Sequence, residues 1–575
     1  MQEEVSLSRS FDPRLTRRLL ALVLPYWPFV LLALACLLVN SVLQILSPLL
    51  TKIAIDRYLA PAPQPTLPWL EQRLPFEPIA GIATVSLLYL AILAAGLLLD
   101  FSQQLIMQWT GQQAMFSLRR RILDHLHRLD LRFFDTNPVG RLVTRVTSDV
   151  DALNELFASG LVSLLGDALV VLFILAAMFR LSPALTLLML AALPLLFLVT
   201  ILFRRAVAAS NRRIRAAVAR INSFLQEHVS GIAVLQLYNR EARAARDFAA
   251  VNAAHRDAYF DSIRAYGWFY PSIEFVSVLT VASLLVAGGW QVRGNALSLG
   301  ILIAFFQYAM RLFRPIQDLS ERYNILQAAL AAAERIFELL DTQPRILPPP
   351  RPCPFPESIA PIEFEDVWFA YKDGDWVLRG VSFTIQPGEV IAVVGHTGAG
   401  KTTLTNLLLR FYDVQRGSIR IGGVDIREFD PRELRRRFGV VLQDPTLFTG
   451  TIADNIRLGS AHVTEDAIEM AAEQVNLLDF IEELPSRFGH PVRERGAGLS
   501  TGQKQLISFA RALAHDPLYL ILDEATSSVD TETELKVREA LEAMVEGRTS
   551  IIIAHRLSTI QRAHRIFVMH KGQLR

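Results

Sequence analysis

The sequence has few cysteines, little excess charge and no short apolar leader. Only two of its 575 residues are cysteines, Cys36 in an apolar run and Cys353 in a proline-rich stretch, so the pattern favours two free thiols over a disulfide framework. The formal net charge of +2 gives no bulk attraction for nucleic acid, and we expect no nucleic-acid partner. Residues 1–20 are polar and charged, which does not match a removable signal peptide.

The chain does have many apolar residues, and they are unevenly distributed. A chain of 575 residues is too long for a single domain. About the first 320 residues contain long apolar runs, whereas the remainder has the mixed composition of a soluble domain. A helix needs about 20 apolar residues to cross a bilayer. Six stretches meet this requirement, at about 26–50, 80–102, 157–180, 184–204, 274–293 and 297–317.

One such stretch could be a buried helix of a soluble protein, but six in succession favour membrane spans. A short connection around Arg180–Pro183 joins spans 3 and 4, and another around Arg293–Asn295 joins spans 5 and 6. In contrast, long arginine-rich segments join span 2 to span 3 and span 4 to span 5. The positive-inside rule places both long segments, and with them both termini, in the cytoplasm. Their apolar periodicity predicts helices that continue beyond the membrane, with breaks at Asp135–Gly140 and Ser230–Gly231.

Three acidic residues, Asp100, Asp167 and Glu274, lie inside or beside the predicted spans. A charge in lipid is costly, so each is a candidate for lining a substrate cavity. Pairing within the helix bundle, or a place at the cytoplasmic interface, remains the alternative for each of them.

A glycine-rich segment carries the clearest chemistry. It lies between a strand-like run, Val390–Val394, and a helical pattern, Leu404–Leu409, and it reads GxxxxGKT. Glycines let successive backbone N–H groups face one anion, and the start of the helix adds partial positive charge. Lys401 would reach the phosphates and Thr402 would offer a hydroxyl to Mg²⁺. The predicted triphosphate site comprises Gly395, His396, Thr397, Gly398, Ala399, Gly400, Lys401, Thr402 and Thr403.

Two further strand-like runs end in candidate catalytic residues. Leu518–Leu522 is followed by Asp523 and Glu524, of which the first could hold Mg²⁺ and the second could orient or deprotonate the attacking water. Ser550–Ala554 is followed by His555, which could contact the γ-phosphate. An acidic turn and a structural histidine are the alternatives.

With the segment Leu499–Gln503, these features make the whole chain resemble an ABC exporter half-transporter. The resemblance implies a multidomain membrane protein with an all-α transmembrane domain of six helices and long cytoplasmic arms, followed by an α/β P-loop ATPase domain with a helical subdomain. We expect the transmembrane domain at 1–342, a proline-rich linker at 343–360 and the nucleotide-binding domain at 361–575.

The resemblance also implies roles for single residues. Tyr371 would stack on adenine, Gln443 would ligate Mg²⁺ and relay to the membrane domain, and Glu494–Gly496 would meet the cytoplasmic arms. The signature segment would contact the γ-phosphate of ATP held by a partner chain, and Ser527–Asp530 would cross the dimer interface. The implied catalytic residues are Glu524, His555 and Gln443; the implied Mg²⁺ ligands are Thr402, Gln443 and Asp523; the further nucleotide contacts are Tyr371, Asp523, Asp530, Ser500, Thr501, Gly502 and Gln503.

The function that the resemblance implies is ATP-driven, alternating-access export of hydrophobic or amphipathic substrates such as drugs, lipids or peptides. It also implies ATP and Mg²⁺ as cofactors, the lipid bilayer and a second half-transporter as partners, and a multi-pass place in the bacterial inner membrane. The N-terminus and the nucleotide-binding domain would be cytoplasmic. The intact Glu524 and His555 argue against an ATP-gated channel. The six spans argue against a soluble ATPase that acts on DNA, and the fusion of both domains in one chain argues against an importer.

The chain departs from the commonest family sequence at Thr501, where glycine is usual. A Cβ at this position could crowd the backbone against the partner's phosphate. Because Gln443, Glu524 and His555 are intact, the pattern resembles the catalytically competent half of heterodimeric bacterial multidrug exporters. We therefore favour a heterodimer, and a homodimeric lipid or drug flippase stays open. The family normally continues past Lys571–Gln573, so the domain either is shortened or ends early.

Overall fold

The computed structural model describes residues 13–60, 67–523, 531–554, 560–561 and 563–575. The chain forms two compact units. One comprises Met1–His125 and Gly140–Asp341, and the other comprises Leu126–Val139 and Thr342–Arg575. A short segment between two helices of the first unit is thus part of the second. Cys36 and Cys353 are both free, as predicted.

The described part of the first unit is helical. Leucine and alanine, which favour helix, dominate its long elements. α13 packs against α2, α7, α8 and α12, and α2 also packs against α8. The helices are α1 (Pro13–Val23), η1 (Leu24–Tyr26), α2 (Trp27–Ala54), the π-helical turn η2 (Ile55–Leu59), α3 (Pro68–Glu71), α4 (Pro78–Leu126), α6 (Val139–Val146), α7 (Ser148–Glu155), η3 (Leu156–Gly160), α8 (Leu161–Leu181), α9 (Pro183–Leu190), α10 (Leu193–Ser230), α11 (Ile232–Leu237), α12 (Glu241–Arg293) and α13 (Leu299–Asp341).

Most of the predicted membrane spans are present as long apolar helices. Within the described residues, five helical stretches are long and apolar enough to cross a membrane: Pro13–Leu59, Pro78–Leu126, Leu164–Leu181, Pro183–Ser230 and Glu241–Arg293. The sixth predicted span, at about 297–317, overlaps the first part of α13, whose described apolar stretch Leu299–Leu312 is shorter. α4 and α12 have 49 and 53 residues, well beyond the roughly 20 that a bilayer requires. The spans therefore continue as long helices, as the periodicity predicted.

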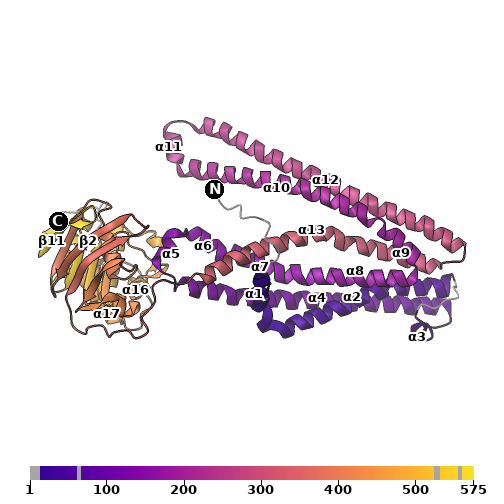
Figure 1. The fold of residues 1–575 in the computed structure, drawn as a ribbon, viewed down its shortest axis with the longest axis horizontal. Helices are drawn as coiled ribbons and strands as arrows, with labels where there is room; N and C mark the ends of the chain where they lie inside the picture. The colour runs from indigo at the N-terminus through magenta and orange to yellow at the C-terminus, as the bar shows by residue number, and fades with distance from the viewer. Residues whose placement is uncertain (1–12, 61–66, 524–530, 555–559, 562) are drawn as a thin grey trace. The chain divides into compact units, whose positions relative to one another are not determined.

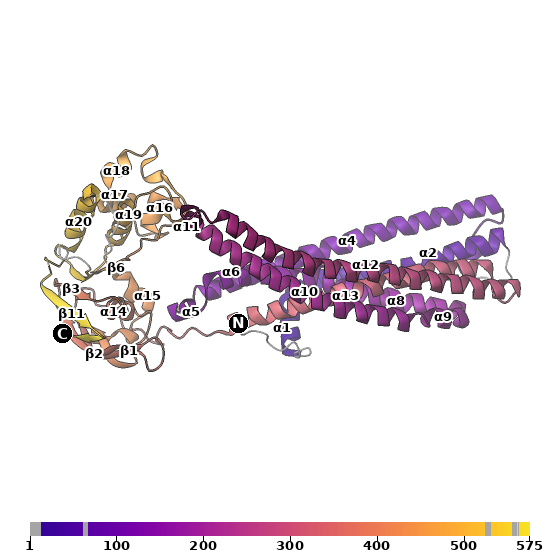
Figure 2. The same ribbon diagram turned by 90° about the horizontal axis from the view of Figure 1, so that it is seen from above.

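Helices α10 and α12 form a long hairpin, with α11 at its turn (Figures 1 and 2). Phe203 stacks on Phe269 with the ring centroids 3.8 Å apart. Further along, the Ser210 hydroxyl donates a hydrogen bond of 2.8 Å to the carbonyl of Ala258. The predicted break at Ser230–Gly231 is the boundary between α10 and α11.

In its described residues, the second unit is an α/β domain with three sheets. The four-stranded sheet is antiparallel and has the order β2-β1-β4-β5. The six-stranded sheet has the order β12-β11-β3-β10-β9-β6 and is parallel except for β12. In the third sheet, β7 pairs with β8. The strands are β1 (Ile362–Ala370), β2 (Trp376–Ile385), β3 (Val390–Gly395), β4 (Arg416–Ile421), β5 (Val424–Asp425), β6 (Phe438–Val441), β7 (Gly450–Thr451), β8 (Pro491–Val492), β9 (Tyr519–Asp523), β10 (Thr549–Ile553), β11 (Arg565–His570) and β12 (Gln573–Leu574).

The helices of the second unit are short and lie on separate cores. One core joins the two larger sheets to α14, and the other lies among α16, α17, α19 and α20, which Figure 2 shows beside the sheets. The apolar runs predicted as buried strands became β3, β9 and β10 in the middle of the parallel sheet. The helices are α5 (Leu131–Thr136), α14 (Lys401–Leu408), η4 (Ile426–Glu428), α15 (Pro431–Arg436), α16 (Ile452–Arg457), α17 (Glu465–Gln474), α18 (Leu478–Glu482), η5 (Arg487–Gly489), η6 (Glu494–Gly496), α19 (Thr501–Ala514) and α20 (Thr531–Val545).

Candidate functional site

The glycine-rich loop lies between β3, which ends at Gly395, and α14, which begins at Lys401. Gly398 and Gly400 have φ angles of +83° and +103°, a region that side chains with a Cβ rarely adopt. At Gly400 a Cβ would also lie 2.7 Å from Cδ2 of Leu378. The loop therefore needs glycine both for its backbone conformation and for its packing, and it places the unpaired N–H groups of the α14 N-terminus at the sheet edge.

Lys401 is folded into this loop and is only 6% exposed. Its Nζ donates hydrogen bonds to the carbonyl oxygens of Gly395, at 2.7 Å, and His396, at 3.2 Å. Burial lowers the pKa of Lys401, and the negative charge of Asp523 partly opposes that shift. The ammonium group thus lies within the loop, where phosphate oxygens would replace carbonyl oxygens as its acceptors.

Thr402 and Asp523 are brought together by the sheet. β9, which ends at Asp523, pairs in parallel with β10, and β10 pairs in parallel with β3, so the carboxyl ends of all three strands meet at one edge. There the Thr402 hydroxyl donates a hydrogen bond of 3.4 Å to Asp523. A hydroxyl and a carboxylate are the oxygen ligands that Mg²⁺ prefers beside phosphates. The pair fits a Mg²⁺–triphosphate complex, which is the chemistry expected from the sequence.

Tyr371 follows β1 directly, and the residue is 36% exposed. Its hydroxyl lies 3.2 Å from Oγ1 of Thr403, in the first turn of α14. Phe369 and Tyr412 contact the ring in T-shaped geometry, with centroid distances of 4.9 Å and 5.2 Å. The ring is held beside the glycine-rich loop with part of its surface open, an arrangement suited to stacking on a base.

Gln443 lies two residues beyond β6 and is exposed. Because β6 pairs in parallel with β9, Gln443 follows a strand that ends at the same edge as Asp523. Among the described residues, no hydrogen bond joins its side chain to Thr402 or Asp523. Gln443 therefore follows a strand that ends at this edge, and its part in the site stays a prediction.

The segment Leu499–Gln503 opens α19 and belongs to the other core. The Ser500 hydroxyl accepts a hydrogen bond of 3.2 Å from the N–H of Gln503, and the Gln503 side chain accepts one of 2.9 Å from the N–H of Ser500. This capping box starts a helix of 14 residues, whose N-terminus carries partial positive charge. Ser500 and Thr501 are exposed and Gly502 is buried. Across the described residues no hydrogen bond connects this segment to the loop at 395–402.

Glu524, Asp530 and His555 lie outside the described residues, as does the whole of 527–530. Glu494–Gly496 is described and forms the short helix η6.

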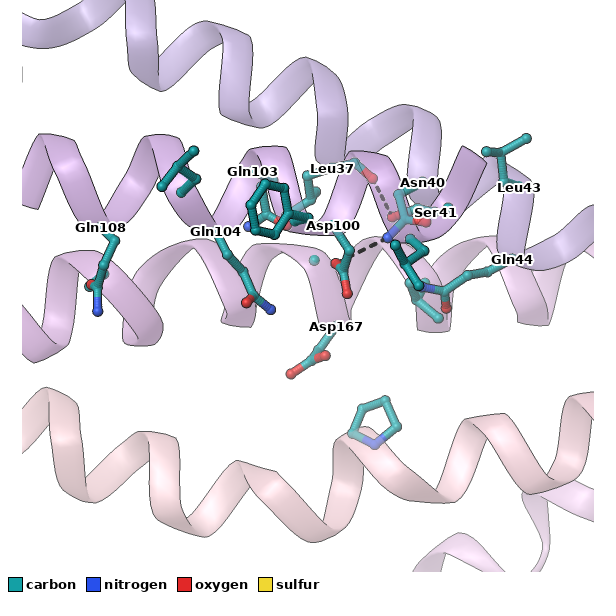
Figure 3. A pocket seen from close by; sticks show the side chains of 18 of the residues that line it. Leu37, Asn40, Ser41, Leu43, Gln44, Asp100, Gln103, Gln104, Gln108 and Asp167 are labelled. Carbon is teal, nitrogen blue, oxygen red and sulfur yellow. Dashed lines mark hydrogen bonds between the residues drawn. The ribbon is translucent and has the colours of Figure 1, made fainter. Parts of the chain in front are cut away.

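A second candidate site is a cavity of about 1140 Å³ in the first unit. Asp100, Gln104 and Gln108 recur every four residues along α4, so they share one face of the helix. Figure 3 shows them pointing into the same space as Asp167 of α8. The amide of Asn40 donates a hydrogen bond of 3.3 Å to Asp100, and Arg322 forms an ion pair of 3.0 Å with Asp167.

Two of the three acidic residues singled out from the sequence, Asp100 and Asp167, line this cavity, whereas Glu274 does not. The amide-bearing residues of the lining were not predicted from the sequence. The recurrence of glutamine at 104 and 108 on an apolar helix, in register with Asp100, was the signal available for them. The missed polar lining residues are Asn40, Ser41, Gln44, Ser47, Gln103, Gln104, Gln108, Asp151, Asn154, Glu155, Arg311 and Arg322.

Comparison with known proteins gives consistent matches over both units. Residues 30–316 match the family described as "ABC transporter transmembrane region", and residues 378–527 match the family "ABC transporter". A "Probable multidrug resistance ABC transporter ATP-binding/permease protein" of Bacillus subtilis is 36% identical over 86% of this chain and 74% of its own length. A "Fatty acid ABC transporter ATP-binding/permease protein" of Mycobacterium tuberculosis is 40% identical over 86% of this chain and 78% of its own length. Among solved structures, a bacterial Atm1-family ABC exporter with ATP bound is similar with a TM-score of 0.73 and 27% identity, over 95% of this chain and 94% of that one.

Proposed function

This chain belongs to the ABC transporter family as an exporter half-transporter, and from that premise we propose that it exports hydrophobic or amphipathic substrates, such as drugs, lipids or peptides. It is an ATP-hydrolysing transporter with a helical transmembrane region and an α/β ATPase region in one chain. The observation that carries the proposal is the assembly of Lys401, Thr402 and Asp523 at one sheet edge of a chain whose other unit holds a polar cavity among apolar helices.

The nucleotide would be held by this chain's own residues. The glycine-rich loop and Lys401 would bind the phosphates, Thr402 and Asp523 would hold Mg²⁺, and Tyr371 would stack on adenine. When bound, Mg²⁺ neutralises charge that develops on the phosphates. Gln443 would complete the metal environment, and Glu524 would orient the attacking water, with His555 near the γ-phosphate.

The cavity supports an amphipathic substrate. Its lining combines leucine and phenylalanine side chains, such as Leu97 and Phe101, with carboxylates and amides, such as Asp100 and Gln104. Apolar contacts would supply affinity for one part of the substrate, and the polar groups would orient another part. The named relatives, one associated with multidrug resistance and one with fatty acids, lie within this range of chemistry.

We place the protein in the bacterial inner membrane as a multi-pass chain with its N-terminus and ATPase unit in the cytoplasm. A second half-transporter would complete it. Ser500 and Thr501 are exposed at the start of α19, where a partner's nucleotide could reach the helix N-terminus. Thr501 favours a heterodimer in which this chain supplies the better ATP site and the weaker signature segment. A homodimeric lipid or drug flippase is the second candidate.

Reconstitution tests the proposal. Liposomes would contain the chain alone, or the chain with a second half-transporter, and the measurements would be ATP hydrolysis and ATP-dependent uptake of a fluorescent amphipathic dye. We expect both activities in the pair and their loss in Lys401→Ala. Glu524→Gln should also abolish them, and Thr501→Gly should raise hydrolysis at the partner's site. Full activity of the chain alone would exclude the heterodimer, and uptake that survives Lys401→Ala would exclude ATP-driven export.

A further inference from the structure

The exposed surface of α10 changes from apolar to basic at one position. Leu198, Leu202 and Arg205 are four and three residues apart, so they share one face of the helix, and all three are exposed. The predicted fourth span ends at this point, at about residue 204. The first of these side chains beyond the span is therefore an arginine.

The exposed surface of α12 shows the same change in the reverse direction of the chain. Arg264, Trp268 and Phe275 are four and seven residues apart, so they share one face, and all three are exposed, Trp268 at 78%. The predicted fifth span begins shortly after Trp268, at about residue 274. This face of α12 therefore passes from arginine through tryptophan to an apolar side chain as the helix enters the span.

The two changes lie at the same height of the hairpin, in which α10 and α12 run side by side in opposite directions (Figures 1 and 2). The stacked rings of Phe203 and Phe269 fix the register, with their centroids 3.8 Å apart. At about 1.5 Å per residue, Arg205 lies about 3 Å beyond this pair and Arg264 about 8 Å beyond it, both on the side away from the spans. The two arginines thus differ in height by about one helical turn, with Trp268 next to the stacked pair. We call Arg205, Trp268 and Arg264 the interfacial band.

The interfacial band carries more positive charge than its neighbours neutralise. Arg205 forms no hydrogen bond or ion pair within the part of the chain that the structure describes. Arg264 shares its partner, because its Nη1 lies 3.6 Å from Oδ1 of Asp261, whose other oxygen is 2.7 Å from Nη1 of Arg213. The next acidic residue along α12 is Glu274, about 15 Å from Arg264 along the helix axis. Both arginines of the band can therefore bind a further anion.

The order of side chains along both helices matches one leaflet of a bilayer. Apolar residues suit the acyl chains, tryptophan is enriched at the membrane–water interface, and arginine is attracted to anionic headgroups. α10 packs mainly against α12, with α9 and α11 at its ends, so its opposite face is left to the surroundings of the chain. A protein partner would not require two antiparallel helices to turn from apolar to basic at the same height, whereas a bilayer does.

We propose that the interfacial band binds anionic phospholipids of the cytoplasmic leaflet. Arg205 and Arg264 would form charge-assisted hydrogen bonds with lipid phosphates, and Trp268 would lie at the level of the glycerol groups. α10 has no acidic residue over 193–226, so none of its carboxylates in that stretch repels such lipids. This recognition of lipid lies outside the transport cavity and goes beyond the export function. It rests only on the proposed orientation in the membrane.

Tryptophan fluorescence of the full-length chain in phosphatidylcholine nanodiscs tests the proposal. A minor fraction of the lipid is phosphatidylglycerol or phosphatidylcholine with bromine on the acyl chain near the headgroup, because bromine quenches a neighbouring indole. The chain has seven tryptophans, so the emission that Trp268→Phe removes isolates that of Trp268. We expect the anionic lipid to quench this emission at an at least about fivefold lower fraction than the neutral lipid, since one arginine near an anionic surface contributes a factor of about five. Salt at about 1 M, where the Debye length is about 3 Å, should remove most of the difference.

Substitution of the two arginines separates charge from packing. Arg205→Gln with Arg264→Gln should remove nearly all of the preference for the anionic lipid, whereas Arg205→Lys with Arg264→Lys should retain most of it, because the charge is kept. Arg220→Gln is the matched control. Arg220 is exposed on α10, 15 positions beyond Arg205 and therefore about 22 Å farther from the span. This exceeds the Debye length of about 8 Å at physiological salt, so the preference should be unchanged in this variant.

Four results would overturn the proposal. Equal quenching by both lipids would mean that the band touches lipid without selecting its charge, and quenching by neither would mean that protein, such as a second half-transporter, covers Trp268. An unchanged preference in the double glutamine variant would remove the role of the two arginines. An equal loss in Arg220→Gln would mean that net charge, and not the interfacial band, attracts the lipid. These results leave the export function untouched, because the measurement uses no ATP, whereas failure of that function would appear as lost ATP-dependent uptake.

Discussion

The carboxylate of Asp56 accepts a hydrogen bond of 2.8 Å from the backbone N–H of Gly300, 244 positions later in the chain. Its second oxygen accepts one of 2.7 Å from the Ser298 hydroxyl and lies 3.2 Å from Nζ of Lys52. Asp56 belongs to η2, which follows α2, and Gly300 to the first turn of α13. The carboxylate thus satisfies an N–H group that the start of α13 cannot pair internally, and it joins the ends of two long helices.

Gly300→Ala should destabilise the transmembrane unit. A Cβ at this position would lie 2.5 Å from Oδ1 of Asp56 and 2.7 Å from the carbonyl oxygen of Lys52, so the two helices must move apart. Overpacking of this kind costs about 1–3 kcal/mol. The measurement is the melting temperature of the full chain in detergent. Gly289→Ala is the control, because nothing lies within 4 Å of its Cβ and removing a helical glycine should be neutral or slightly stabilising. Equal melting temperatures for both variants would contradict the role of Gly300.

Gly400→Ala should abolish nucleotide binding. The φ angle of +103° disfavours alanine, and its Cβ would lie 2.7 Å from Leu378 Cδ2 and 3.2 Å from the carbonyl of Val377, so the loop around Lys401 must shift. Gly374→Ala is the matched control, because it has a φ of +87° but open space around its Cβ. We expect only the first variant to lose binding of a fluorescent ATP analogue, measured as a Kd. Comparable loss in both would mean that backbone strain, and not the packing against Leu378, decides the outcome.

The sequence predicts local features of this protein well and long-range pairings poorly. The apolar runs predicted the long helices, and an apolar run followed by a glycine-rich loop predicted β3 and α14. Both predictions succeed because each signal depends only on residues that are neighbours in the sequence. The contact between Thr402 and Asp523 followed from parallel strands that end at one edge. The hydrogen bond from Tyr412 to Asp135 could not be predicted in this way, because no local pattern states which distant side chain meets a short helix.

The pH dependence of stability should report the ion pair between Glu389 and Arg565. Arg565 donates two hydrogen bonds to this carboxylate, and together with the N–H of Gln386 it holds the pKa of Glu389 below its ordinary 4.5. A carboxylate with a lowered folded-state pKa stabilises the protein fully above the unfolded value of 4.5, and this contribution is lost as pH falls through the folded pKa.

Glu389→Gln should therefore lower the melting temperature at pH 7, and its difference from the unaltered chain should shrink below pH 4.5. The pair is partly exposed, so its contribution is about 1 kcal/mol or less, equivalent to about 2–4 °C for a domain of this size. Glu357→Gln, at an exposed position, is the control and should change nothing. A constant difference between Glu389→Gln and the unaltered chain from pH 7 to 4 would indicate an effect other than charge.

Asp100→Asn should alter the handling of cationic substrates. Asp100 lines the cavity and receives a hydrogen bond from Asn40, so its carboxylate is held where a substrate's positive group can approach it. Losing a hydrogen bond to a charged group costs about 1.5–3 kcal/mol, which corresponds to a roughly tenfold or greater rise in the half-saturating concentration. The measurement is ATP-dependent uptake of a cationic amphipathic dye and of a neutral dye of similar size, in liposomes. We expect the rise for the cationic dye alone. Glu274→Gln is the control. Glu274 was also predicted from the sequence as a candidate cavity residue, because a charge in lipid is costly, but it does not line the cavity. An equal effect of the two variants on the cationic dye would show that the general charge of the membrane unit, and not the position of Asp100 in the cavity, governs uptake.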